Sequence, residues 1–345
     1  MRGLEAEIGK KLKNFELDAA FSQADGCLGI LGPSGCGKSM TLRAVAGLVR
    51  PDRGRICLDG RILFDSGKRV DLSVQKRKVG YLFQNYALFP NMTVAENIRA
   101  GMRKGPAAGK NLAELVRRFH LEGLEGRYPG QLSGGQQQRT ALARIFASDA
   151  QCLLLDEPFS AMDSYLREEM QIGLAQIIRE FEGCMVLVSH DRDEIYRLCD
   201  RTLIMENGKS VVCGGTRELF ARPRRVAAAR LTGCKNLSRI RRAGDFQVHA
   251  LDWHVTLQTK EPVTSRITHV GIRAHDILPA PEGEDVPNRI RVLVKEKVYS
   301  PFEWTLVFQN LEEPGAGIWM KRERGDMQVP EAVTVDPAKI LLLEE

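Results

Sequence analysis

A short stretch near the start of the chain has the residue types and the spacing needed to bind phosphate. It runs from Gly32 to Ser39 and reads Gly-Pro-Ser-Gly-Cys-Gly-Lys-Ser. Glycines allow the backbone to turn tightly, so that successive N–H groups can converge on one anion. The ammonium of Lys38 can reach the outer phosphates of a nucleoside triphosphate, and the Ser39 hydroxyl can ligate Mg²⁺. The candidate phosphate-binding residues are therefore Gly32, Pro33, Ser34, Gly35, Cys36, Gly37, Lys38 and Ser39.

The flanking residues indicate where this stretch lies in a fold. Residues 27–31 form a short apolar run, which is typical of a buried parallel strand. Apolar residues then recur from Met40 to Leu48 with helical spacing. The phosphates would consequently lie at the N-terminus of a helix, where free N–H groups and the helix dipole favour negative charge. The alternative, a chance glycine-rich turn, does not explain the strand before the stretch and the helix after it.

Another pair of glycines precedes a second amphipathic run. The sequence Leu-Ser-Gly-Gly-Gln at residues 132–136 leads into apolar positions that recur as far as Phe146. A serine before two glycines places free backbone N–H groups at the start of a helix. Ser133, Gly134 and Gly135 therefore form either a second phosphate cradle or an ordinary helix N-cap, and the pattern fits both.

Titratable residues follow two further apolar runs. Asp156 and Glu157 end the strand-like run at residues 152–155. In a phosphate-loop enzyme the first acid completes the Mg²⁺ shell, and Glu157 is placed to orient or deprotonate an attacking water. His190 follows the run at residues 184–188, at the edge where open α/β sheets bind ligands. Solvated acids and a structural histidine are the plainer alternatives.

The composition is that of an ordinary globular protein. With 345 residues, of which 27% are charged and 43% hydrophobic, the chain is long enough for two domains. Its net charge of +6 is spread along the chain and does not indicate a nucleic-acid partner. The eight cysteines lack a C-x-x-C pattern, which favours reduced, buried thiols over a metal site or a disulfide framework.

Two local features bear on the cellular location. The sequence begins without an apolar signal-peptide core, and no run approaches the ~20 apolar residues of a membrane helix. We therefore expect a cytoplasmic chain that reaches a membrane only through a partner. The densest basic spots, at residues 222–225 and 239–242, are expected to be a linker or a solvated face.

The order of these patterns predicts an α/β phosphate-loop cassette, with a mixed sheet and a helical subdomain, followed by a small all-β domain. Alternating residues before position 31 and the turn signal Asp59-Gly60 indicate antiparallel strands. Residues 87–150 are mostly helical by pattern and would form the subdomain. We place the first domain at residues 1–221 and a linker that includes a helix at 222–237. Short β-rich segments from 238 to 345 suggest a small barrel.

These motifs, in this order, resemble those of ATP-binding cassette (ABC) transporter ATPases. The resemblance covers about residues 1–230 and includes the phosphate loop, the signature at 132–136 and residues 153–157. It also includes Gln84, Asp163 and His190. The signature with Gln-Gln-Arg after it belongs to this family and not to other phosphate-loop proteins. The tail resembles the small TOBE-like β-barrel that follows the cassette in many bacterial importers for oxyanions, sugars and polyamines.

Further stretches are similar to the molybdate/sulfate branch of these importers. They are residues 77–81, 88–90, 232–236 and 271–275. The resemblance therefore implies the ATP-hydrolysing subunit of an importer for an oxyanion, namely molybdate, tungstate or sulfate. An importer for a polyamine, iron or a sugar is the alternative.

The resemblance also implies a role for each site residue, with ATP and Mg²⁺ as ligands. The backbone N–H groups of residues 35–39, together with Lys38, would hold the phosphates. Glu157 would act as general base on the lytic water, and His190 would contact the γ-phosphate. The implied Mg²⁺ ligands are Ser39, Gln84 and Asp156.

Partners follow from the same resemblance. Two copies of the chain would sandwich two ATP molecules head to tail, with Asp163 across the interface. The second copy would contact the nucleotide through Ser133, Gly134, Gly135 and Gln136. The surface at residues 84–97 would receive a helix of an integral membrane permease, on which an extracytoplasmic substrate-binding protein acts. The chain would thus attach peripherally to the cytoplasmic face of the membrane.

The sequence departs from the family pattern in three places. Met40 stands where the family has a second hydroxyl that holds the α-phosphate, although its backbone N–H remains as a contact. Met162 replaces the usual leucine before Asp163. The aromatic residue that stacks on adenine lies about two dozen residues before the loop in the family. Residues 8–12 contain none here, and Phe15 is the nearest.

Two other functions fit less well. A soluble ABC ATPase that acts on DNA or ribosomes usually carries two cassettes or a long coiled coil, whereas this chain has one cassette and no heptad insertion. A phosphate-loop kinase or GTPase would lack the signature, and the guanine-selecting Asn-Lys-x-Asp is absent. The tail either senses the oxyanion, through residues such as Arg273 and His275, or only widens the dimer interface.

Overall fold

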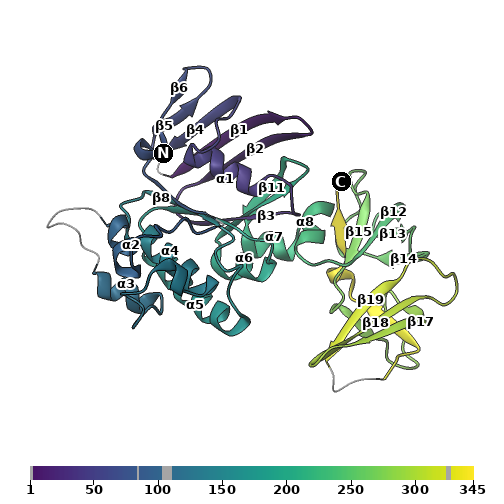
Figure 1. The fold of residues 1–345 in the computed structure, drawn as a ribbon. Helices are drawn as coiled ribbons and strands as arrows, with labels where there is room; N and C mark the ends of the chain where they lie inside the picture. The colour runs from purple at the N-terminus through teal and green to yellow at the C-terminus, as the bar shows by residue number, and fades with distance from the viewer. Residues whose placement is uncertain (1–2, 84, 103–110, 324–327) are drawn as a thin grey trace. The chain divides into compact units, whose positions relative to one another are not determined.

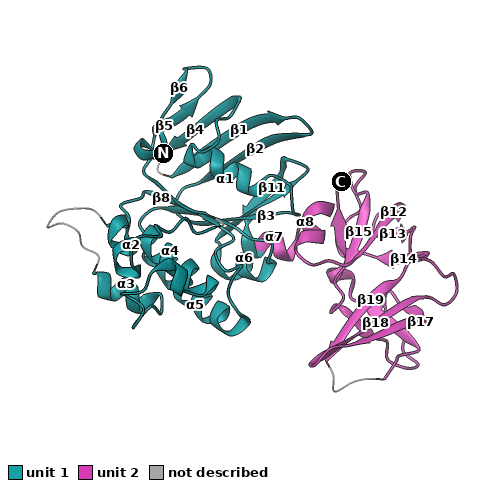
Figure 2. Cartoon of the chain, in the orientation of Figure 1, with its two compact units in different colours: residues 1–217 teal, residues 218–345 magenta. Residues whose placement is uncertain are grey.

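The chain forms two compact units, Met1–Arg217 and Glu218–Glu345 (Figure 2). The computed structural model describes residues 3–83, 85–102, 111–323 and 328–345. The boundary between the units precedes residue 221, where the sequence pattern ended the first domain. The segment 222–237, expected as a linker with a helix, contains α8 (Val226–Leu231) and the first residues of β12 (Asn236–Gly244).

One mixed sheet organises the first unit (Figure 1). Its strand order is β6-β5-β4-β1-β2-β11-β10-β3-β9-β8-β7. The strands are β1 (Leu4–Leu12), β2 (Phe15–Gln23), β3 (Gly26–Leu31), β4 (Arg53–Leu58), β5 (Arg61–Asp65), β6 (Val70–Asp71), β7 (Val79–Leu82), β8 (Cys152–Asp156), β9 (Cys184–Val188), β10 (Arg201–Glu206) and β11 (Lys209–Gly215). β10, β3, β9, β8 and β7 run parallel, whereas β2, β1, β4, β5 and β6 pair in antiparallel fashion.

The parallel strands are apolar because they form the core of this unit. Every residue of β8 and β9 is buried, as expected for strands covered on both faces. The antiparallel strand β2 instead alternates buried and exposed residues, which fits a sheet with one solvated face. In Figure 1 the helices α2 to α5 gather on the side of the first unit away from β4, β5 and β6.

Local sequence fixes where the helices begin. Thr93 and Ser133 each form a capping box with the glutamate or glutamine three residues later, and Asp163 and Asp191 cap α5 and α6. The helices are α1 (Lys38–Ala46), α2 (Val94–Gly101), α3 (Leu112–Arg118), α4 (Gly134–Ala147), α5 (Ser164–Glu180), α6 (Arg192–Leu198), α7 (Thr216–Ala221) and α8 (Val226–Leu231). Short 3₁₀ turns occupy Val74–Lys76, Pro129–Gln131 and Pro337–Lys339. Among the helices of the described residues, none has the length and apolar character to span a membrane.

Two five-stranded sheets form the second unit, in the orders β14-β13-β12-β15-β21 and β16-β20-β17-β18-β19. They share one core, whose largest buried side chains are Trp253 and Trp304. The strands are β12 (Asn236–Gly244), β13 (Gln247–Ala250), β14 (Val255–Gln258), β15 (His269–Ile272), β16 (Ile277–Pro279), β17 (Ile290–Tyr299), β18 (Glu303–Asn310), β19 (Ile318–Glu323), β20 (Ala332–Val335) and β21 (Leu341–Leu343). The predicted fold class, a mixed α/β cassette followed by a small all-β, barrel-like domain, is confirmed.

All eight cysteines are free thiols, and only Cys213 is not fully buried. They are distributed through both cores, with Cys27, Cys152 and Cys184 on central strands of the first unit and Cys234 in the second. The Sγ atoms of Cys27 and Cys199 lie 3.4 Å apart and share a hydrogen bond. The thiols therefore act as small apolar core residues.

Candidate functional site

Three parallel strands end side by side and bring separate motifs together. Ile30 of β3 and Asp156 of β8 both pair with Val188 of β9. Residues 32–39 follow β3, Glu157 follows β8 directly, and His190 lies two residues beyond β9. The carboxyl edge of the parallel sheet thus gathers the phosphate loop, the acidic pair and the histidine, as open α/β sheets do at ligand sites.

The phosphate loop requires glycine at position 37. Gly37 has φ 104°, and an added Cβ would come within 2.8 Å of Leu17 Cδ1 and 3.0 Å of the Phe15 ring. α1 begins directly after it, and the first helical bond runs from Thr41 N to Gly37 O at 2.9 Å. The N–H groups of residues 38–40 precede that bond, so they are the free donors of a helix N-terminus. Met40 itself packs against the core of the unit.

Lys38 is held over the loop by two backbone carbonyls. Its Nζ donates to Gly32 O at 2.7 Å and to Pro33 O at 3.0 Å. Only 7% of the residue is exposed, so the ammonium remains hydrogen-bonded although it is nearly buried. One positive charge therefore lies beside the free N–H groups of α1, where an anion is favoured.

Ser39 and Asp156 supply oxygen ligands next to the loop. Ser39 Oγ donates to Asp156 Oδ1 at 2.8 Å, and the Tyr81 hydroxyl donates to Asp156 Oδ2 at 3.0 Å. Burial and the adjacent Asp156 carboxylate raise the pKa of the Tyr81 hydroxyl, so it stays protonated and remains a donor. A hydroxyl with one carboxylate fits Mg²⁺, which is bound by one or two carboxylates plus phosphates and water. Gln84, the third predicted ligand, lies outside the described residues.

Glu157 pairs with His190 in the structure. The His190 Nδ1 and Glu157 Oε1 atoms are 3.4 Å apart, and the His190 side chain is 65% exposed. Glu157 has φ 51°, a left-handed backbone that is uncommon for a residue with a Cβ. Its N–H donates to Val188 O at 3.0 Å, which ties it to the neighbouring strand β9. A half-buried carboxylate and an exposed imidazole can together hold and move a proton here.

The loop that carries His190 is anchored from below by a buried acid. Ser189 Oγ donates to Glu194 Oε2 at 2.6 Å and accepts from Asp191 N at 2.9 Å. Burial raises the pKa of Glu194. Gln171 of α5 donates to the other carboxylate oxygen at 3.3 Å. His190 is therefore presented by a fixed turn.

The signature at residues 132–136 forms the exposed N-terminus of α4. Ser133 Oγ accepts from Gln136 N at 3.3 Å, and Gln136 Oε1 accepts from Ser133 N at 2.9 Å. Gly134 and Gly135 lie against Ala161, close to the exposed Asp163 that caps α5. In the part of the chain that the structure describes, no hydrogen bond joins this stretch to residues 32–39. The start of the signature helix thus lies against Ala161, two residues before Asp163, and Ser133, Gly134 and Asp163 are exposed.

A cavity of about 320 Å³ opens beside the phosphate loop. It is lined by Phe15 from the start of β2, by loop residues including Gly35 and Cys36, and by Asn207 from the β10–β11 turn. Burial raises the pKa of the Cys36 thiol, which keeps it neutral. In the sequence, Phe15 lies closer to the loop than the adenine-stacking aromatic residue of the family does, so the spacing alone assigned it no role. The fold nevertheless brings its ring against the loop at Gly37.

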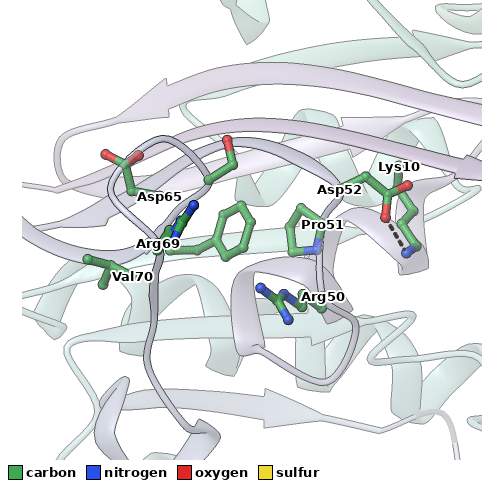
Figure 3. Close-up of a pocket in the computed structure, with 9 residues that line it drawn as sticks. Lys10, Arg50, Pro51, Asp52, Asp65, Arg69 and Val70 are labelled. Carbon is green, nitrogen blue, oxygen red and sulfur yellow. Dashed lines mark hydrogen bonds and ion pairs between the residues drawn. The ribbon is translucent and has the colours of Figure 1, made fainter.

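Another cavity, of about 380 Å³, lies on the antiparallel part of the sheet (Figure 3). Its walls include Arg50, Asp65 and Arg69, and Lys10 Nζ forms a 2.7 Å ion pair with Asp52 Oδ1. The ion pair and the backbone N–H of Lys11 lower the pKa of Asp52. None of the predicted site residues lines this cavity.

Tyr81 and Gln138 belong to the site but escaped the sequence analysis. Tyr81 contacts Asp156 through the parallel pairing of β7 with β8, and Gln138 Nε2 donates to Glu157 O at 3.2 Å. A polar tip at the end of an apolar strand was the available signal for Tyr81. The sequence offered no signal for Gln138, because it is one of three successive glutamines and the sequence does not show which of them faces the core.

Comparison with known proteins agrees with this arrangement. A family model described as ABC transporter matches residues 16–160. A sulfate/thiosulfate import ATP-binding protein of Synechocystis sp. is 36% identical over 308 residues, which cover 88% of this chain and 82% of that protein. A molybdenum import ATP-binding protein of Rhodospirillum rubrum is 37% identical, and the match covers 64% of this chain and 60% of that protein. A spermidine/putrescine import ATP-binding protein of Nitratidesulfovibrio vulgaris is 40% identical, and the match covers 67% of this chain and 64% of that protein.

Solved structures give the same result. The ATP-binding cassette MJ0796, in a dimeric post-hydrolysis state bound to ADP and Pi, is 26% identical with a TM-score of 0.53. The match covers 62% of this chain and 99% of that cassette. The chain therefore belongs to the ABC transporter family, whose ATP-binding cassette it carries.

Proposed function

We propose that the chain hydrolyses ATP to power an importer for an oxyanion, with sulfate and molybdate as the first candidates. The observation that carries ATP hydrolysis is the pairing of Glu157 with His190 beside the contact between Ser39 and Asp156. Relatives named for sulfate/thiosulfate and molybdenum import support the oxyanion, and tungstate has the same chemistry. The relative named for spermidine and putrescine supports a polyamine as the second candidate.

In this proposal each group at the sheet edge has one task. Lys38 and the N–H groups at the start of α1 bind the phosphates. Ser39 and Asp156, with Gln84, hold Mg²⁺, which when bound offsets phosphate charge. Glu157 takes a proton from the attacking water, and His190 steadies the Glu157 carboxylate and contacts the γ-phosphate.

Tyr81→Phe tests the proposed Mg²⁺ site. The change removes the donor to Asp156 Oδ2 and leaves the ring in place, so the carboxylate loses one of its two fixed contacts. We expect the Mg²⁺ concentration that gives half-maximal ATP hydrolysis to rise about tenfold, as for other partners of metal ligands. The measurement is a Mg²⁺ titration at fixed ATP, with the exposed Tyr299→Phe as control. An unchanged Mg²⁺ requirement would contradict the role of Tyr81.

We propose that a second copy completes the ATP site. Ser133, Gly134 and Asp163 are exposed, and α4 begins there with N–H groups that can bind an anion. The dimeric cassettes among the solved structures support this assembly. Gly135 and Gln136 would then bind the γ-phosphate of ATP held by the partner.

The proposed permease surface is a rigid apolar loop. Phe89 is 47% exposed and Met92 37%. The buried Asn97 fixes the loop because it accepts from Phe89 N and donates to the carbonyls of Phe89, Met92 and Thr93. Arg144 donates to two further loop carbonyls. We propose that residues 84–97 receive a permease helix, which attaches the chain to the cytoplasmic face of the membrane.

Phe15 is the proposed partner of the adenine base. Its ring lines the cavity beside the loop, and stacking of a base on an aromatic ring contributes ~1–3 kcal/mol. We expect Phe15→Ala to raise the Kd for ATP about tenfold while the Kd for tripolyphosphate, which lacks a base, stays unchanged. Isothermal titration with both ligands measures the difference. Equal losses for the two ligands would show that Phe15 supports the loop and does not contact the base.

We propose that residues 1–221 form the ATPase domain and that the second unit is TOBE-like and widens the contact between two copies. Oxyanion sensing by this unit is less favoured, because the terminal nitrogens of Arg273 already donate to the carbonyls of Phe220 and Thr232. His275 is exposed and free of that constraint. The guanidinium of Arg273 is thus occupied by hydrogen bonds within the unit.

Uptake measurements test the transported substrate. A strain that lacks this chain is supplied with labelled sulfate, molybdate and spermidine, and uptake is compared with the complemented strain. We expect loss of uptake for one oxyanion and unchanged uptake of spermidine. Loss of spermidine uptake alone would assign the polyamine instead, and an extracytoplasmic binding protein for the same solute should be required.

A further inference from the structure

Gln138 is a buried polar side chain that the proposed roles leave unused. It lies on α4 and has 0% exposed surface. Its Nε2 donates to the backbone carbonyl of Glu157 at 3.2 Å. Its Oε1 is buried and has no hydrogen-bond partner among the residues that the structure describes. The orientation of the amide follows from the Glu157 carbonyl, which can only accept.

The backbone of Glu157 depends on contacts of this kind. Its φ of 51° is unfavourable for a residue with a Cβ and persists only where the surroundings fix it. Besides Gln138, the Glu157 carbonyl accepts from Ser160 N at 3.3 Å and from Ser160 Oγ at 3.1 Å. Of these three donors, Gln138 alone comes from another element of the fold. It therefore sets where the carbonyl lies relative to α4.

We propose that Gln138 is a positioning residue for Glu157, an inference that rests on the proposed role of Glu157 as general base. By holding the carbonyl, Gln138 keeps the left-handed backbone that directs the carboxylate toward His190, 3.4 Å away. α4 begins at the signature, next to Ser133. The same hydrogen bond therefore links the helix proposed to bind the partner's ATP with the residue that activates water.

The unpartnered Oε1 distinguishes this role from simple packing. A buried oxygen without a partner lowers stability, whereas an apolar side chain of the same length would fill the space without that cost. The contribution of the Gln138 amide to the folded chain therefore lies in the hydrogen bond to Glu157. Replacing the amide should consequently lower turnover without lowering the stability of the fold.

Gln138→Met tests the proposal in the full-length chain. Methionine has a similar length and no donor, so the pocket stays filled while the hydrogen bond is lost. We expect kcat for ATP hydrolysis to fall about tenfold or more, because small displacements of a reacting group are costly. We expect KM for ATP to stay within about twofold, since the phosphate loop is untouched. The thermal midpoint should be unchanged or raised.

Gln23→Met is the matched control. Gln23 is also buried, donates through Nε2 to one backbone carbonyl, that of Asp25, and has an Oε1 without a partner among the described residues. It ends β2, about 26 Å from Phe15 at a rise of ~3.3 Å per residue. We expect this variant to keep the wild-type kcat and KM, with a thermal midpoint that is unchanged or raised.

The outcomes separate this inference from the proposed function. A wild-type kcat in Gln138→Met would overturn the inference and leave the proposed function intact. A fall in kcat accompanied by a lower thermal midpoint, or by an equal fall in Gln23→Met, would assign Gln138 to folding and also overturn it. A wild-type chain without Mg²⁺-dependent ATP hydrolysis would overturn the proposed function and this inference with it.

Discussion

Glu157→Gln is expected to lower kcat for ATP hydrolysis at least a hundredfold, because loss of a general base costs ~10²–10⁴ in rate. The amide keeps the size of the side chain and can still contact His190, but it cannot accept a proton from water. ATP binding should be unaffected, since the phosphate loop and the contact between Ser39 and Asp156 remain. ATP that binds and is not consumed should then stabilise the dimer.

Phosphate release and size-exclusion chromatography with ATP and Mg²⁺ measure the two effects of Glu157→Gln. Glu7→Gln, an exposed change on β1, is the control that should leave both unchanged. Normal hydrolysis in Glu157→Gln would contradict the role of this carboxylate as general base. Reduced ATP affinity would instead show that Glu157 acts in binding.

Lys38→Met should abolish nucleotide binding at micromolar concentrations. The ammonium offers charge-assisted hydrogen bonds to phosphate, each worth ~1.5–3 kcal/mol, so losing two of them raises Kd at least a hundredfold. Methionine fills the same space but leaves the carbonyls of Gly32 and Pro33 without their donor. We expect that to cost ~1–3 kcal/mol of folding free energy, which a chain of this size tolerates.

Isothermal titration of ATP into Lys38→Met measures the affinity, and thermal unfolding without nucleotide confirms that the chain is folded. Lys76→Met, at an exposed lysine, is the control for loss of one positive charge. An affinity within tenfold of the wild type would mean that the helix N-terminus binds the phosphates without Lys38.

Much of the site was predictable because its signals are local. The spacing of glycines around Lys38, the apolar strand before it and the helical period after it all lie within about two dozen residues. The strand that ends at Asp156 and the one before His190 are equally explicit, since buried parallel strands are continuous apolar runs. Adjacency of these strand ends then follows from the fold class.

The features that were missed depend on pairing over long distances in the chain. Tyr81 meets Asp156 only because β7 lies beside β8, and Gln138 meets Glu157 only because of how α4 packs. The linker expected at 222–237 includes the first two residues of β12, because its pairing with β15 is with a strand far along the chain. β16 and β21 have three residues each, too few for an alternating pattern to be recognised.

The reactivity of the buried cysteines can report transient unfolding of the folded chain. Because a thiol reacts as thiolate, burial that raises the pKa of Cys234 to about 11 protects it twice, by exclusion of reagent and by protonation. Cys152 and Cys184 are buried on central strands of the other unit, where reagent cannot reach them. Labelling of these three thiols by a small alkylating reagent therefore requires a unit to open, and its rate measures the transient unfolding of each unit without any engineered reporter.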